Sequence, residues 1–231
     1  MVSSYTPTVH SLNNKCNASV TLSKYTNLLL ISQPNTPSLS SLPWTRKETH
    51  DLKALMNGSG VTTLLLEDAR ATIDKVKTEM KAYNWVHFAC HGIQDMSDSL
   101  KSGVHLHNGR LKLLEIMQQQ IPNPNLAFLS ACETSKGDLN LSEEVVHLAA
   151  GMLATGYHGV VGTMWSISDM HGPEFAMEFY QYLLMKKRAS QALDSTQAAY
   201  ALDHAVRKVR ESLGQSDTSF LTWVPYVHFG Y

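Results

Sequence analysis

The sequence has little net charge and few cysteines. Nineteen basic side chains nearly balance twenty acidic ones, so no overall field attracts nucleic acid or an anionic membrane surface. Cys16, Cys90 and Cys132 are an odd number of cysteines at wide spacings. This pattern argues against a disulfide framework and favours a reducing compartment.

Signals for membrane insertion and export are also missing. No apolar run reaches the roughly 18 residues that a transmembrane helix needs. The opening residues 1–10, MVSSYTPTVH, lack the basic and apolar regions of a secretory signal. We therefore expect a cytoplasmic protein with no membrane partner and no nucleic-acid partner.

The length and composition are typical of a globular domain. The chain has 231 residues, of which 43% are hydrophobic and 17% charged, enough to bury a substantial core. The first residues are polar, and we interpret 1–24 as an N-terminal extension or linker and 25–231 as one folded domain. No internal repeat and no second boundary are evident.

Apolar runs alternate with amphipathic stretches along the domain. Expected strands are 27–32, 61–68, 85–90, 125–131 and 158–165, with a last edge strand in WVPYVHFGY at 223–231. Expected helices are 42–56, 69–83 with Asp68 as N-cap, 111–120, 142–156 with Ser142 as N-cap, 171–187 and 190–213. Residues 93–110 suggest a loop or short hairpin. This alternation predicts an α/β fold with a mainly parallel sheet covered on both faces.

Two of the expected strands end on reactive side chains. WVHFACHG at 85–92 leads to His91, and NLAFLSACE at 125–133 leads to Cys132. Functional groups of a parallel sheet gather at the carboxyl ends of its strands. If these two strands are neighbours, the two side chains come within reach of a proton transfer.

A cysteine beside a histidine suits nucleophilic catalysis. An imidazole can lower the pKa of a thiol or take its proton during attack, so Cys132 would be the nucleophile and His91 its base. The backbone N–H groups of Gly92 and Cys132 could hold the oxyanion. Buried cysteines and strand-end histidines are also common core residues, and Cys90, inside its strand, is assigned to packing.

The wider sequence resembles a known family. HFACHG at 87–92, LSACETSKGDL at 129–139 and EEVVHLAAGMLATGYHGVVGTMWSISD at 143–169 resemble the CHAT domain, a caspase-like module often linked to tetratricopeptide repeats. The resemblance runs from about residue 25 to the end. It implies a caspase-like three-layer α/β/α sandwich, the catalytic dyad His91 and Cys132 of a caspase/separase-type cysteine protease, and an oxyanion donor at Gly92.

Ser130-Ala131 precedes the cysteine where caspases carry an acidic or amide residue and then Ala, so aspartate specificity does not follow. Further candidates for the substrate pocket are four residues near the same strand ends: Glu133, Asp138, Trp165 and Asp169. Trp165 could instead cap the core, and the carboxylates could be solvated loop residues.

Metal and cofactor chemistry have little support in the sequence. His87 and His91 would converge on a metal only from a helix, and their segment is predicted to be a strand. His105 and His107 share a strand face but have no partner at ligand spacing. We expect no metal and no cofactor.

These features favour a cysteine endopeptidase that acts on a peptide or protein and is gated by a partner or ligand, for which a repeat domain is one candidate. Two alternatives stay open. One is a catalytically silent CHAT signalling or scaffold module, and the other is a thiol-dependent hydrolase or transferase acting on something other than peptides.

Overall fold

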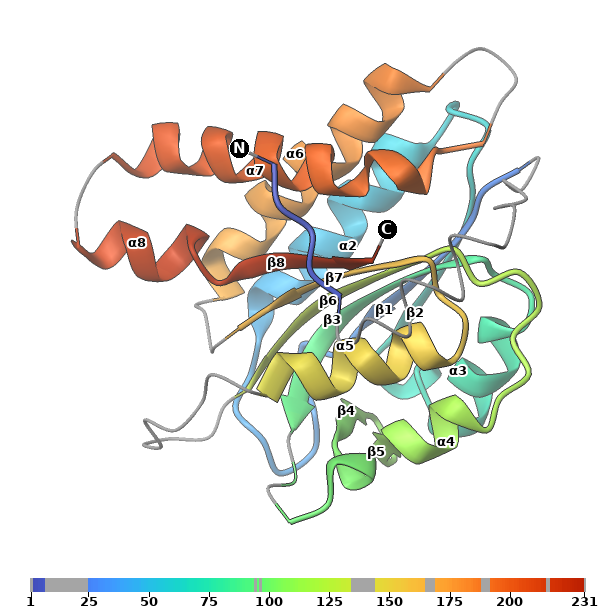
Figure 1. The fold of residues 1–231 in the computed structure, drawn as a ribbon. Helices are drawn as coiled ribbons and strands as arrows, with labels where there is room; N and C mark the ends of the chain where they lie inside the picture. The colour runs from blue at the N-terminus through green and yellow to red at the C-terminus, as the bar shows by residue number, and fades with distance from the viewer. Residues whose placement is uncertain are drawn as a thin grey trace.

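The computed structural model arranges the chain around one sheet (Figure 1). The described residues are 2–6, 25–93, 95, 97–133, 144–164, 169–187, 192–214 and 217–230, with only the backbone described for 131–133, 144–147 and 217–218.

Six strands follow the order β2-β1-β3-β6-β7-β8, and the hairpin of β4 and β5 extends from β3. Their bounds are β1 Asn27–Ser32, β2 Thr62–Glu67, β3 Trp85–Ile93, β4 Gly103–Leu106, β5 Gly109–Lys112, β6 Leu126–Glu133, β7 Gly159–Thr163 and β8 Tyr226–Gly230. Along this path β8 runs antiparallel to β7, and the other pairs are parallel. The prediction of a mainly parallel sheet is confirmed.

Helices cover both faces of the sheet. They are α2 Pro43–Met56, α3 Ile73–Met80, α4 Leu113–Met117, α5 Glu144–Ala154, α6 Gly172–Lys186, α7 Ala198–Leu213 and α8 Asp217–Trp223. Figure 1 shows α2, α6 and α7 on one face and α3, α4 and α5 on the other. The two hydrophobic core clusters lie between these helix layers and the sheet, so the predicted three-layer sandwich is confirmed.

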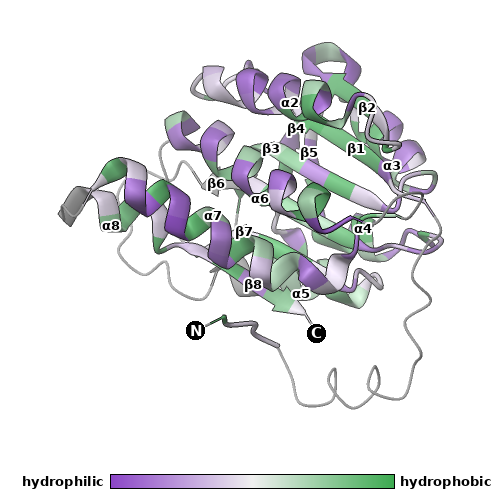
Figure 2. Ribbon diagram, turned by 90° about the horizontal axis from the view of Figure 1, so that it is seen from above, coloured by the Kyte–Doolittle hydropathy of each residue, from purple (hydrophilic) through white to green (hydrophobic). Residues whose placement is uncertain are grey.

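Hydropathy follows the layers. In Figure 2 the strands are largely hydrophobic, and the helices over them carry hydrophilic residues along their length. Parallel strands buried on both faces are expected to be nearly continuous apolar runs. These apolar runs are the reason that the strands could be predicted from the sequence.

The central strand β3 sorts its side chains between the two faces. Phe88 and Cys90 belong to the core cluster under α3 and α5, whereas Trp85 belongs to the cluster under α2 and α6. Successive residues of a strand point to opposite faces. Cys90 is therefore a packing residue on the face opposite to His91, as predicted.

Helix starts were harder to predict than strands. Asp68 does not cap α3, because it opens a short 3₁₀ turn with φ of 47°, and its carboxylate accepts hydrogen bonds from Asn35 N–H and from Arg46. Thr72 is the cap instead, with its side chain accepting from Lys75 N–H. Because its carboxylate bonds to these distant residues, Asp68 does not act as the N-cap that its sequence position suggested.

Two other helices differ from the prediction in their bounds, and one helix was not expected. The expected helix 111–120 shortens to α4 because 109–112 pair as β5 in the hairpin. α7 begins at Ala198 rather than 190, since the Asp194 side chain accepts from Thr196 N–H and starts a 3₁₀ turn. α8 was not predicted. Ser142 lies outside the described residues.

The predicted edge strand at the C-terminus is confirmed as β8. Tyr5 lies against its outer side, where its N–H donates to the His228 carbonyl at 2.9 Å and its carbonyl accepts from Gly230 N–H at 2.9 Å. The His228 ring is buried, and Nδ1 lies 2.8 Å from Ser4 Oγ. Burial lowers the pKa of His228 to about 4.

This buried imidazole predicts acid sensitivity. Unfolded His228 titrates near 6.5 and folded His228 near 4, so between these values only the unfolded state binds the proton, and stability falls as pH falls. We expect His228 to contribute a loss of about 2 kcal/mol between pH 7.5 and pH 5. Urea unfolding at both pH values measures it.

The matched control is His50→Gln, which replaces an exposed histidine on the surface. His228→Gln should flatten the pH dependence by about the predicted amount, and His50→Gln should not. Equal pH dependence in wild type and His228→Gln would contradict the prediction.

Candidate functional site

The parallel pairing of β3 and β6 brings the two predicted reactive residues to one end of the sheet. The register runs from Trp85 opposite Leu126 to Gly92 opposite Glu133, and it pairs His91 with Cys132. Both residues stand at the carboxyl ends of their strands, the rim that the sequence pattern predicted. The side chains of Cys132 and Glu133 lie outside the described part of the structure.

His91 is fully buried and fixed by a backbone carbonyl. Its Nε2 lies 2.7 Å from the Ser40 carbonyl oxygen. A carbonyl oxygen only accepts hydrogen bonds, so Nε2 carries the proton. In the neutral ring the basic nitrogen is therefore Nδ1.

The connection between β1 and α2 holds the Ser40 carbonyl in place. Pro34 ties its two ends, since the Pro34 carbonyl accepts from Leu42 N–H at 2.9 Å and from Ser41 Oγ at 3.1 Å. Leu39 N–H donates to the Thr36 carbonyl at 3.2 Å. The hydrogen bonds of this connection therefore fix the position of the carbonyl that contacts His91.

Gly92 and the hairpin lie next to His91. Gly92 is buried in the sheet between β4 and β6, opposite Val104 on one side and Glu133 on the other. His105 of β4 is partly buried, and its pKa is lowered first by burial, then by Arg110, which is its partner on β5, and then by His91.

Asp169 lies where the chain leaves β7 and enters α6. It opens a 3₁₀ turn, and its Oδ2 accepts from Trp44 N–H at 3.2 Å. Trp44 is in the first turn of α2. This turn contains no acidic residue, and no side chain of the N-cap residue bonds to it. Asp169 therefore supplies the carboxylate that this helix start lacks. Asp138 and Trp165 lie outside the described residues.

A buried polar cluster lies deeper on the same face. Its members are Glu48 of α2, His87 of β3, Ser130 of β6 and Tyr180 of α6. This cluster was not predicted from the sequence, where His87 was considered as a metal ligand and that role was rejected. A signal was present, because Glu48 interrupts the buried stripe of α2 formed by Thr45, Thr49, Leu52 and Met56.

Among the described residues, no group of three or more His, Cys, Asp or Glu side chains could hold a metal ion. No helix within the described ranges is long and apolar enough to span a membrane.

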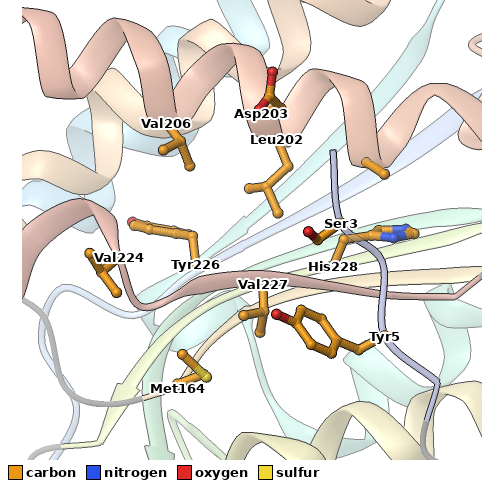
Figure 3. Close-up of a pocket in the computed structure, with 11 residues that line it drawn as sticks. Ser3, Tyr5, Met164, Leu202, Asp203, Val206, Val224, Tyr226, Val227 and His228 are labelled. Atoms are coloured by element: carbon orange, nitrogen blue, oxygen red, sulfur yellow. The ribbon is translucent and has the colours of Figure 1, made fainter. Parts of the chain in front are cut away.

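One pocket of about 290 Å³ lies away from His91, at the β8 edge of the sheet. Figure 3 shows side chains from α7, β8 and the N-terminal residues around it, including Leu202, Tyr226 and Tyr5. Its described lining residues include none from β3 or β6, and β7 lies between β6 and this edge. The pocket is therefore distinct from the paired strand ends.

Solved structures with a similar fold are cysteine proteinases and a separase. The Arg-specific cysteine proteinase gingipain R is 12% identical, with a TM-score of 0.64 over 95% of this chain and 50% of its own. Porphyromonas gingivalis RgpB, in a complex of its pro- and mature domains, is 11% identical, with a TM-score of 0.60 over 95% of this chain and 51% of its own. Saccharomyces cerevisiae separase, solved with securin, is 14% identical, with a TM-score of 0.63 over 100% of this chain and 14% of its own.

The fold is thus the caspase-like fold of these proteins. The sequence model of the CHAT domain matches residues 2–231, and the chain belongs to the CHAT domain family. It spans about half the length of the gingipain chain and a seventh of the separase chain. A comparison with curated protein sequences gives no match.

The contact of Asp169 with α2 predicts a measurable loss of stability. Asp169→Ala removes the acceptor for Trp44 N–H and should lower the free energy of unfolding by about 1 kcal/mol. Asp169→Asn keeps an oxygen acceptor and should recover part of the loss. Urea denaturation of the three proteins measures both. If Asp169→Ala is as stable as wild type, the helix-capping role is wrong.

Proposed function

We propose that the chain is a cysteine endopeptidase in which Cys132 is the nucleophile and His91 the general base. The observation that carries the proposal is the register of β3 and β6, which sets the two residues opposite each other at the ends of adjacent strands. Neighbouring strands lie about 4.8 Å apart. Two side chains that leave such a pair on one face can exchange a proton.

The rows below the pair support a common face. His87 and Phe128 are partners in the register, and their rings stack with centroids 4.7 Å apart. Ser130, in the next row on that face, donates to Glu48 of α2 at 3.1 Å. Strand alternation extends this face to positions 91 and 132.

The His91 environment suits a base. With Nε2–H held by the Ser40 carbonyl at 2.7 Å, the ring has one orientation and a basic Nδ1. In the proposed reaction, Nδ1 takes the thiol proton while sulfur bonds to the carbonyl carbon of the peptide. The imidazolium then gives that proton to the leaving nitrogen as the C–N bond breaks, and water hydrolyses the thioester to restore the thiol.

The proposed oxyanion donors are the backbone N–H groups of Gly92 and Cys132. Gly92 follows the base directly, and it has no Cβ that would obstruct a substrate at the strand end. Two such donors act where charge develops on the carbonyl oxygen. Glu133, Asp138, Trp165 and Asp169 remain proposed pocket residues.

We further propose that a protein partner or ligand gates the activity. The His91 ring is completely buried, so a leaving group reaches it only after local opening. Separase, a neighbour in fold, was solved in complex with securin. CHAT domains often occur with tetratricopeptide repeats, which could supply such a partner.

An alkylating peptide probe tests the dyad. Cys132 should label fastest, and Cys90, buried on the other face, should label slowly. His91→Ala should slow labelling of Cys132 at pH 7 by at least ten-fold, since a positioned base contributes about 10²-fold or more. Mass spectrometry of the labelled peptides, with rates from a time course, gives the result.

Ser40→Ala is the matched control, because the bond to His91 uses the backbone carbonyl and survives the substitution. It should label at the wild-type rate. Cys132 labelling no faster than Cys16, with no effect of His91→Ala, would overturn the dyad. Fast, His91-dependent labelling without cleavage in a protein-substrate screen, even with added repeat-domain partner, would favour the silent scaffold module.

A further inference from the structure

The buried cluster of Glu48, His87, Ser130 and Tyr180 joins four elements beneath the proposed dyad. His87 and Tyr180 are fully buried, and Glu48 and Ser130 are 1% and 6% exposed. His87 lies four residues before His91 on β3, and Ser130 lies two residues before Cys132 on β6. At about 3.3 Å per residue, these are short distances along each strand.

Glu48 is the centre of this cluster. His87 Nε2 lies 2.8 Å from Glu48 Oε1, and Ser130 Oγ donates to Oε2 at 3.1 Å. Both carboxylate oxygens therefore have a partner. A Cβ on residue 172 would lie 2.6 Å from Glu48 Oε2, so glycine at the start of α6 leaves room for the carboxylate.

Tyr180 completes the cluster from α6. Its hydroxyl lies 3.4 Å from His87 Nδ1, and burial, with the Glu48 charge second, raises its pKa well above the usual value. The phenol is therefore neutral and can donate to the ring. Ser130 bonds to the carboxylate and not to His87, so the cluster lacks the order of a Ser-His-acid catalytic triad.

A buried carboxylate is costly unless it is paired, and apolar replacements are often as stable. Such groups can instead fix one arrangement of the elements that they join. Main-chain bonds already align β3 with β6, but α2 reaches these two strands through side chains. Glu48 provides hydrogen bonds from α2 to both strands.

We propose that Glu48 is a positioning residue that anchors α2 on β3 and β6 and so holds the Ser40 carbonyl against His91. Ser40 lies on the connection that leads into α2, eight residues before Glu48. Three parts of the site, His91, Cys132 and the Ser40 carbonyl, are thus tied to one carboxylate. This inference rests on the proposed function for its effect on reactivity, but its effect on His91 can be observed separately.

The test replaces Glu48 and its two hydrogen-bonded partners by apolar groups in the triple variant Glu48→Leu, His87→Phe, Ser130→Ala. We expect a folded protein in which Cys132 labels at least ten-fold more slowly. Its labelling should follow the pH dependence of an ordinary thiol, near 8.5. Glu48→Gln keeps the shape and can pair with both partners if the Ser130 hydroxyl turns, so it should stay within three-fold of wild type.

The readout independent of reactivity is the NMR signal of the His91 ring. In wild type the Nε2–H proton should be protected from exchange, and its protection should fall at least ten-fold in the triple variant. Thr49→Val is the matched control, because Thr49 is a buried polar residue of α2 whose hydroxyl, among the described residues, donates only to the carbonyls of Thr45 and Arg46 in the same helix. It should change neither readout.

Unchanged protection of the His91 ring in a folded triple variant would overturn the proposal, whatever the labelling shows. A second outcome would separate the two proposals. If protection falls in the triple variant, but His91→Ala alone does not slow the labelling of Cys132, the anchoring role is supported and the proposed dyad is wrong. If the triple variant does not fold, Glu48→Asp gives the same comparison, because it shortens the anchor but keeps the carboxylate. It should reduce protection, and wild-type protection would overturn the proposal.

Discussion

The in-register parallel pairing of β3 with β6 is the constraint on which the rest of the site depends. A slip of one residue in either strand would exchange its two faces. Phe88 and Cys90 would leave the apolar cluster under α3 and α5, and His87 would lose Glu48 and enter that cluster. Burial on both faces therefore specifies the register strongly, and the same register pairs His91 with Cys132.

Buried polar side chains further fix the arrangement of the sheet face that carries His91. Most of the core between the sheet and α2, α6 and α7 is apolar. Glu48, His87 and Ser130 are nevertheless buried within it, and His87 and Ser130 are both hydrogen-bonded to Glu48. Closer to the rim, the hydrogen-bond partners of the side chains are backbone groups. His91 bonds to the Ser40 carbonyl, and Asp169 accepts from Trp44 N–H. Contacts across long sequence separations thus join the loops around the strand ends.

The strands and the order of the elements could be predicted because their signals are local. Continuous apolar runs predicted β1, β3, β6 and β7, and the placement of His91 and Cys132 at strand ends followed from them. The prediction of Asp68 as the cap of α3 was wrong because its carboxylate accepts hydrogen bonds from Asn35 and Arg46, which are distant in sequence. α8 is too short to show a periodic pattern.

The support of the site could not be predicted, for a related reason. Glu48 meets its partners across 39 and 82 residues, and Asp169 meets Trp44 across 125. No spacing rule connects such residues. Only the presence of a carboxylate on the buried stripe of α2 hinted that a polar partner existed.

Disulfide trapping tests the central claim most directly, because it reports the register and face of residues 91 and 132 without requiring activity. In a His91→Cys, Cys16→Ser chain, residues 91 and 132 would be direct partners on neighbouring strands, within the Cα separation of roughly 4.4–6.8 Å that a disulfide spans. Mild oxidation followed by peptide mapping should give the 91–132 disulfide and none between Cys90 and Cys132. A disulfide between Cys90 and Cys132, or none at 91–132, would contradict the account.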